Sequence, residues 1–170
     1  MMFEVYCDGS ATTGDKPGGF AFVLCCDGVK IGEGSGHLTK ATNNVAEITA
    51  AIRGLDAVSK TREFQLYITE NAGKLPATTL VSDSQLTLKY ANGEYQCRKY
   101  HLLQLYLELR RHYQKIGATT RWVKGHSGDE HNERCDELAK AARANPNIQT
   151  QISQVSASST EVVGEAISEQ

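Results

Sequence analysis

Long apolar runs are missing from this chain, and its first residues lack the pattern of a secretory signal. No apolar stretch approaches the roughly 20 residues that a helix needs to cross a bilayer. The N-terminus, MMFEVYCDGS, carries an acid early and has no basic region followed by an apolar one, so it does not resemble a secretory signal. We therefore expect a cytoplasmic protein with no membrane partner.

Cysteine is scarce, and several familiar catalytic motifs are absent. The five cysteines are odd in number and have no Cys-x-x-Cys spacing, which argues against a disulfide framework or a sulfur-bound zinc site. Cys7 and Cys25 lie in apolar runs typical of strands, so we expect most of the cysteines to be reduced core residues. The sequence has no Walker loop, GxGxxG, GxSxG or HExxH motif.

Net charge is also small, at −2, but the basic residues are unevenly distributed. Residues 86–124 contain eight bases and two acids, a local charge of +6. The bases are Lys89, Arg98, Lys99, Arg110, Arg111, Lys115, Arg121 and Lys124. Such a segment is typical of a phosphate-facing patch, and equally of the solvated face of a helix. Charge alone leaves both interpretations open.

The order of the expected elements indicates an α/β fold. Alternating or apolar runs predict strands at 3–8, 20–26 and 29–38, with a hairpin turn at Asp27-Gly28. Further strands are expected at 77–83 and 119–125. Apolar residues at intervals of three and four predict helices over 45–58, 102–116 and 132–144. This order predicts a mixed sheet with its first three strands antiparallel and helices on both faces.

Two segments are less regular than the rest. In residues 60–79, Phe64, Leu66 and Ile68 alternate, and the segment is interpreted as either an extra hairpin arm or a surface loop. Residues 146–170 are rich in Ser, Thr and Gln and contain no aromatic residue, which is typical of a flexible tail. The chain is therefore divided into a domain at 1–145 and a C-terminal tail.

Four acidic residues stand at the edges of these elements. Asp8 and Asp83 end two strands, Glu47 lies in the first turns of the 45–58 helix, and Asp136 lies early in the last helix. We expect them to meet at the carboxyl edge of the sheet. Clustered carboxylates repel one another unless cations offset their charge, and oxygen ligands select hard ions such as Mg²⁺ or Mn²⁺. Two such ions catalyse phosphodiester hydrolysis.

Each acid also has an ordinary structural interpretation. Asp8-Gly9 is a common turn pair, Asn44 and Glu47 have the spacing of a capping box, and Asp83 precedes a helix that it is suited to cap. Asp136 is suited to an exposed helix face. The combination of the four positions favours the metal site over these alternatives.

The stretches YCDGSATTGDKPGGFAF, TNNVAEITAAI, SDSQL and WVKGHSGDEHNERCDELA, in this order, resemble type 1 ribonuclease H. The resemblance covers residues 3 to about 145. It implies the ribonuclease H-like fold with a five-stranded sheet, and Asp8, Glu47, Asp83 and Asp136 as ligands of two Mg²⁺ or Mn²⁺ ions. His126 matches a mobile histidine that assists proton transfer or product departure. Asn132 matches a residue near the catalytic water or the scissile phosphate.

The resemblance also implies a substrate. The family cleaves the RNA strand of RNA–DNA hybrids without sequence specificity, leaving 5′-phosphate and 3′-hydroxyl ends. A hybrid has a wide, shallow minor groove in which 2′-hydroxyls mark the RNA strand. The residues that match substrate contacts are Gly9, Thr42, Asn43, Asn44, Gln85 and Asn132. For Thr42 and Asn43, helix capping is a compatible alternative.

The chain departs from many bacterial members in one region. A tryptophan and a basic protrusion that grip the DNA strand are replaced here by KYANGEYQCRKYHL, which resembles the subgroup without the protrusion. Our hypothesis is that Tyr95, Arg98 and Lys99 take over part of the DNA-strand contact. The alternative is that Tyr95 packs locally while the two bases are merely solvated.

Three functions remain to be separated. The first is a hybrid-specific endonuclease that acts as a monomer. The second is a nuclease of the same fold that acts on another duplex, such as double-stranded RNA. The third is a hybrid-binding module without catalysis, which the presence of all four acids and the histidine disfavours.

Overall fold

A mixed sheet forms the centre of the computed structural model, which describes residues 1–148 and 151–154. Its strands are β1 (Met2–Ser10), β2 (Gly18–Cys26), β3 (Val29–Leu38), β4 (Ala77–Ser82), β5 (Thr119–Trp122) and β6 (Gln151–Gln154), in the order β5-β4-β1-β2-β3-β6. The first three strands are antiparallel, as predicted, and β4 and β5 run parallel to β1. The central part of the sheet therefore has the predicted arrangement.

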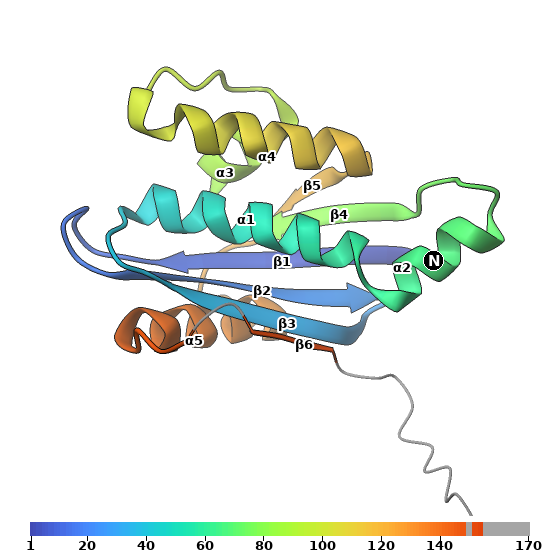
Figure 1. Ribbon diagram of the computed structural model, residues 1–170, viewed down its shortest axis with the longest axis horizontal. Coiled ribbons are helices and arrows are strands. Elements are labelled where there is room, and N and C mark those ends of the chain that lie inside the picture. The colour runs from blue at the N-terminus through green and yellow to red at the C-terminus, as the bar shows by residue number, and fades with distance from the viewer. Residues whose placement is uncertain (149–150, 155–170) are drawn as a thin grey trace, which may run out of the picture.

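Helices cover both faces of this sheet (Figure 1). α1 (Asn43–Ser59), α3 (Gln85–Asn92) and α4 (Leu103–Ile116) lie on one face, and α5 (Glu130–Ala144) lies on the other. A 3₁₀ turn, Tyr100–Leu102, precedes α4. No helix in the described part of the chain is long and apolar enough to cross a membrane.

Alternate side chains of β1 pack into two buried layers, one on each face of the sheet. Phe3, Val5 and Cys7 belong to the large core that includes apolar residues of α1. Tyr6, on the opposite face, packs in a smaller cluster with Cys135 of α5. Because helices cover both sides of the strand, its polar face is buried too, and Asp8 is only 4% exposed.

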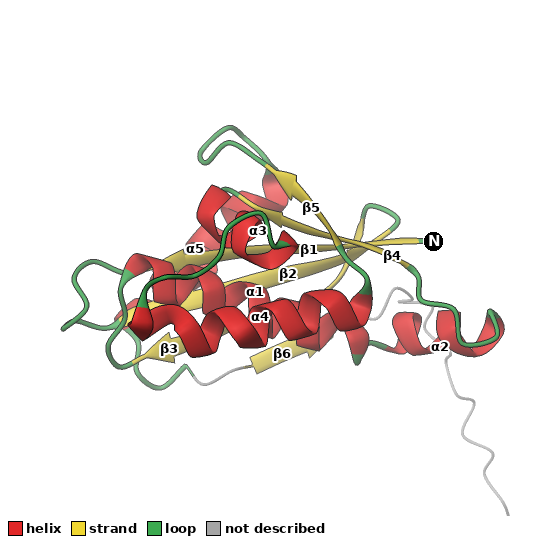
Figure 2. Ribbon diagram, turned by 90° about the horizontal axis from the view of Figure 1, so that it is seen from above, coloured by secondary structure: helices red, strands yellow, loops and turns green. Residues whose placement is uncertain are grey.

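The segment between α1 and β4 is neither a hairpin arm nor only a loop. It contains a helix, α2 (Arg62–Glu70), which lies near the N-terminal end of β1 (Figure 2). Phe64 is buried while Leu66 is about half exposed, which fits a helix rather than the alternation of a strand. The Thr61 hydroxyl caps the helix by accepting a hydrogen bond from the Phe64 N–H.

The sheet has six strands where five were expected. β6 pairs antiparallel with the outer edge of β3, from Gly32 opposite Gln154 to Ser35 opposite Gln151. It lies inside the segment 146–170, which the sequence predicts to be a flexible tail. An edge strand offers unpaired main-chain groups, and a polar segment can pair with them without any apolar pattern. The remainder of the predicted tail, at 149–150 and 155–170, lies outside the described residues.

Candidate active site

Asp8 and Asp83 come together because β1 and β4 are parallel neighbours. The last paired residues of the two strands are Tyr6 and Val81, and each aspartate lies two positions beyond that pair. The two therefore project from the same face of the sheet at the same edge. The sequence predicted that Asp8 would end the first strand. It does not, because β1 continues to Ser10 and pairs Asp8 with Ala21 of β2.

Glu47 reaches this edge because α1 packs directly on Gly9. A Cβ at Gly9 would lie 2.4 Å from the Glu47 main-chain nitrogen and 2.5 Å from the Ala46 carbonyl carbon. Only glycine permits this approach of backbone to backbone. Gly9, predicted as a substrate contact, is thus buried against α1 and allows Glu47 to lie beside Asp8.

Carboxylate oxygens of Asp8, Glu47 and Asp83 all lie within 4.8 Å of one another. Glu47 is 6% exposed, and its Oε2 atom has no hydrogen-bond partner in the described part of the chain. A buried carboxylate oxygen without a donor is costly unless something positive binds it. This donor set, oxygen only and strongly negative, fits a hard divalent cation.

Burial and mutual repulsion disfavour the charged forms of these acids. Burial, followed by the charge of Asp83, raises the pKa of Asp8 to about 7. Burial, followed by the charges of Asp8 and Asp83, raises the pKa of Glu47 to about 10. The pKa of Asp83 is also raised, mainly by burial, although a hydrogen bond from the Asn132 side chain opposes the shift. The cluster is therefore poised to gain stability from a bound cation.

The capping alternatives fail for two of these acids. The Ser84 hydroxyl, not Asp83, caps α3 by accepting from the Thr87 N–H. Thr42 caps α1 by accepting from the Val45 N–H, so Asn44 and Glu47 do not form the capping box that their spacing allowed. Neither Glu47 nor Asp83 is needed to begin a helix.

Asp136 lies next to this trio rather than within it. It stands on α5, which covers the face of the sheet opposite α1, and its oxygens are not among those that approach within 4.8 Å of one another. Lys140, one turn later, places its Nζ 2.8 Å from the Asp136 Oδ2. The negative charge of Asp136 still raises the pKa of both Asp8 and Asp83. The structure thus brings three of the predicted acids together and leaves the fourth within electrostatic reach.

The loop before α5 and the start of that helix supply the remaining predicted polar groups. Asp129 caps α5 by accepting from the Asn132 N–H at 2.9 Å, and this leaves the buried Asn132 side chain beside Asp83. His126 is exposed, has a positive φ of 55°, and its charge lowers the pKa of Asp83. Both predicted residues therefore lie near the carboxylate cluster.

The predicted minor-groove residues stand at the starts of two helices that begin at this edge. Thr42 uses its hydroxyl as the cap of α1, so the capping role is confirmed for it. Asn43 and Gln85, the first residues of α1 and α3, are exposed, and Asn44 is partly exposed. These side chains are available to a ligand that approaches the carboxylates.

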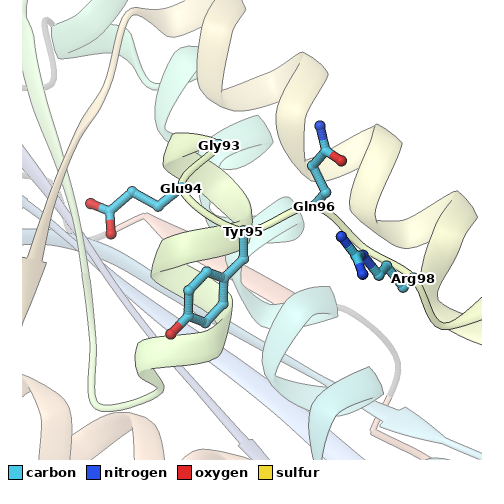
Figure 3. A pocket seen from close by; sticks show the side chains of 5 residues that line it. All are labelled: Gly93, Glu94, Tyr95, Gln96 and Arg98. Atoms are coloured by element: carbon cyan, nitrogen blue, oxygen red, sulfur yellow. The ribbon is translucent and has the colours of Figure 1, made fainter.

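The loop after α3 carries the predicted DNA-strand residues, of which Figure 3 shows Tyr95 and Arg98. An open pocket of about 460 Å³ is lined by Gly93, Glu94, Tyr95, Gln96 and Arg98. Tyr95 packs locally, with the Lys89 Nζ 3.2 Å from its hydroxyl and 4.8 Å from its ring centre, yet it remains 47% exposed. Arg98 and Lys99 are exposed. The local packing of Tyr95 and its access to a ligand are therefore compatible.

Two contacts near the site were not predicted from the sequence. The Trp122 Nε1 donates a hydrogen bond of 3.0 Å to the main-chain oxygen of Asp83. His131, which no motif singled out, packs its ring 5.0 Å from that of Tyr6. The sequence gives one hint of these contacts, because Trp122 and His131 lie on either side of the glycine loop that contains His126.

Comparisons with known proteins identify relatives along nearly the whole described domain. Residues 2–144 match the RNase H family model. A ribonuclease H from Actinobacillus pleuropneumoniae is 36% identical over 149 residues, covering 87% of this chain and 94% of the relative. The crystal structure of RNase H1 from the halophilic archaeon Halobacterium salinarum NRC-1 superposes with a TM-score of 0.67 at 26% identity, over 84% of this chain and 97% of that one. The crystal structure of LC11-RNase H1 in complex with an RNA/DNA hybrid shares the fold, with a TM-score of 0.67 at 22% identity, over 84% of this chain and 96% of that one.

Proposed function

The chain belongs to the ribonuclease H family, and from that premise we propose that it hydrolyses the RNA strand of RNA–DNA hybrids with two divalent metal ions, without sequence specificity. It is an endoribonuclease and a phosphodiester hydrolase. The products are a 5′-phosphate and a 3′-hydroxyl end. We assign this activity to a catalytic domain at residues 1–145.

The observation that carries the proposal is the trio of carboxylates around the unpartnered Glu47 oxygen. Asp8, Glu47 and Asp83 would hold Mg²⁺, or Mn²⁺ in its place, with Asp136 beside them when the substrate is bound. Such ions activate the attacking water and stabilise charge on the leaving 3′ oxygen. An all-oxygen donor set with this charge is suited to them and poorly suited to zinc.

The surrounding residues position the reacting groups. Asn132, held at the start of α5, orients the Asp83 carboxylate through the hydrogen bond that lowers the pKa of this acid. His126, exposed on its glycine loop, assists proton transfer or product departure. Its removal should slow turnover without abolishing it, because the carboxylates remain in place.

Substrate recognition uses the polar side chains at the starts of α1 and α3. Asn43, Asn44 and Gln85 lie along the edge that contains the carboxylates, and short polar groups there can read 2′-hydroxyls and shape without reading sequence. Thr42, at the same edge, would lie near a phosphate of the DNA strand. We propose that the main-chain atoms of Gly9 line the same surface. Part of the DNA strand would contact the exposed faces of Tyr95, Arg98 and Lys99, which belong to the basic segment 86–124.

We further propose that the enzyme works in the cytoplasm as a monomer. The location is supported by the five free thiols, of which Cys7, Cys25 and Cys135 are buried. The monomer is supported by a catalytic cluster assembled entirely from one chain. Sedimentation with and without a hybrid duplex would test the oligomeric state.

A cleavage panel tests the function. The protein is incubated with RNA–DNA, RNA–RNA and DNA–DNA duplexes of one sequence in Mg²⁺, Mn²⁺ or EDTA. We expect cleavage of the hybrid alone, only with a divalent ion, and only in its RNA strand. Cleavage of RNA–RNA at a similar rate would favour the broader nuclease. Binding of the hybrid without cleavage in the presence of either Mg²⁺ or Mn²⁺ would show that the protein is a hybrid-binding module without catalysis.

The DNA-strand contact has its own test. Replacing Arg98 and Lys99 together by Ala should raise KM and flatten the dependence of binding on salt, because phosphate contacts release counterions. Replacing Arg53 of α1 and Lys60, the residue just after α1, which are also exposed, provides a control with the same loss of charge. If both double variants behave alike, the effect comes from net charge and the assignment to this loop is wrong.

A further inference from the structure

The loop that contains His126, residues 123–129, contacts the body of the protein through Val123, whose N–H donates to the Ser82 carbonyl, and through Gly125, which lies against Asp83, while most of its other residues are exposed. Lys124, His126, Ser127 and Gly128 are exposed. Its internal side-chain hydrogen bond joins the Ser127 hydroxyl to the Lys124 carbonyl at 2.6 Å. A loop with so little internal support depends on its two ends for its position.

Both ends of this loop meet the same residue. Arg121 is the next-to-last residue of β5, before the loop, and His131 is the second residue of α5, after it. The Arg121 Nη2 donates to the Tyr6 hydroxyl at 3.0 Å, and its guanidinium carbon lies 5.9 Å from the Tyr6 ring centre. The ring centre of His131 lies 5.0 Å from that of Tyr6, with the planes tilted by 54°. Tyr6 thus contacts the entry and the exit of the loop.

Tyr6 is well suited to hold these two neighbours. It lies in the central strand β1, two residues before Asp8, and is 5% exposed. Glu4, on the same face of the strand and also buried, accepts a 2.5 Å hydrogen bond from the Arg121 Nη2. The buried Tyr6 hydroxyl accepts from Arg121 and lies 3.4 Å from the Glu4 Oε2, to which it donates. The anchor is therefore part of a buried strand in the middle of the sheet.

We propose that Tyr6, with Arg121 and His131, is a positioning device that holds the two ends of the 123–129 loop and so keeps His126 beside the carboxylate cluster. None of the three touches the reacting atoms. They act through His126, because fixing both ends of a loop lowers the number of conformations available to the residue at its tip. This inference rests on the catalytic role proposed above for His126.

The simplest variant removes the aromatic contact from the exit of the loop. His131→Ala deletes the ring that packs on Tyr6, and because His131 is only partly buried the protein should stay folded. His131→Phe restores an aromatic ring and should rescue the effect. Glu133→Ala, an exposed change in the first turn of the same helix, controls for helix stability. Tyr6→Phe keeps the ring and removes only the hydroxyl that accepts from Arg121.

Steady-state cleavage of a hybrid is measured with and without His126→Ala in each background. We expect His131→Ala to lower kcat about fivefold with little change in KM, as loss of one aromatic contact would suggest. In the His126→Ala background the same change should have no further effect. An equal loss in both backgrounds would show that His131 acts on the fold rather than through His126, and would overturn the proposal.

Limited trypsin cleavage after Lys124 supplies a readout independent of catalysis. We expect His131→Ala to speed cleavage at this exposed loop site several-fold, while cleavage after the distant Lys74 stays unchanged as an internal reference. If His126→Ala keeps full activity, the catalytic role of the histidine fails, and faster cleavage after Lys124 still supports the anchoring. Unchanged cleavage after Lys124 overturns the anchoring whatever the kinetics show.

Discussion

Gly125 lies against Asp83 so closely that a Cβ at position 125 would stand 2.9 Å from the Asp83 Oδ2 atom. The loop glycine therefore leaves room for the carboxylate to occupy its place in the cluster. Gly125→Ala should displace the carboxylate, since a side-chain oxygen moves more easily than a backbone. We expect stability within about 1 kcal/mol of the original. Hybrid cleavage should fall, and the Mg²⁺ concentration for half-maximal activity should rise. An unchanged Mg²⁺ dependence would show that Asp83 tolerates the methyl group in place.

Asp8→Asn should separate catalysis from stability. Turnover should be lost even at saturating Mg²⁺, because a neutral amide is a poor ligand for a hard cation. In EDTA at pH 8 the variant should be more stable to unfolding by about 1 to 3 kcal/mol, because the repulsion among the buried acids is reduced. Near-normal cleavage by the variant would remove Asp8 from the metal site.

The raised pKa of Asp8 also predicts how the stability of the metal-free protein depends on pH. The pKa of Asp8 is raised to about 7 from an ordinary value of 3.8, so the folded state holds a proton that the unfolded state has released. Stability from this group is therefore greatest below about pH 4 and falls as the pH rises towards 7. Urea unfolding in EDTA at pH 5 and pH 8 should show a smaller decrease for Asp8→Asn than for the original chain.

Much of the fold was predictable because the apolar residues recur in the sequence with the periods of strands and helices. Strands 3–8, 20–26 and 29–38 and helices 45–58 and 102–116 all appear in the structure with small changes at their ends. The helix α2 was missed because Phe64, Leu66 and Ile68 satisfy the alternation of a strand, while Phe64 and Ile68 also have the spacing of a helix. Only the tertiary contact of Phe64 and the Thr61 cap select the helix.

The sixth strand could not be predicted for a different reason. β6 pairs through its main chain with the edge of β3, and main-chain pairing leaves no signature in a polar segment. In the candidate site, the positions of Glu47 and Asp83 were predictable from a helix start and a strand end, whereas β1 continues past Asp8 to Ser10. The greater separation of Asp136 was not predictable, because it depends on how α5 packs across the sheet. Gly9 shows the same limit, since its close packing against α1 depends on the helix crossing.

Glu33 of β3 and Arg134 of α5 form a paired contact whose contribution can be measured. Arg134 donates from Nε at 3.0 Å and from Nη2 at 2.9 Å to the two carboxylate oxygens, and Lys30 also contacts Glu33. The Arg134 hydrogen bonds are the main cause that lowers the pKa of Glu33 to about 2. We expect Glu33→Gln to lower the free energy of unfolding by about 1 to 2 kcal/mol at pH 7.

The pH dependence of this contact has the opposite sign to that of Asp8. A lowered pKa means that the stabilisation is fully present above the unfolded value near 4.5 and is lost as the pH falls through about 2. Asp56→Asn, which breaks an exposed pair with Lys60 on α1, should cost no more than about 0.5 kcal/mol and serves as the control. Equal losses in the two variants would mean that the contact between β3 and α5 contributes no more than a surface pair.

Trp122 offers an optical report of the metal site, because it is the chain's only tryptophan and its Nε1 donates to the Asp83 main-chain oxygen. Its ring is 49% exposed, so its emission should respond to a nearby change of charge. Adding Mg²⁺ without substrate should alter the fluorescence in a saturable way, and EDTA should reverse the change. The response should be lost in Asp83→Asn but retained in His126→Ala, which removes no carboxylate. If Asp83→Asn responds to Mg²⁺ as the original chain does, the signal comes from ions bound elsewhere, and Asp83 is not a ligand in the substrate-free protein.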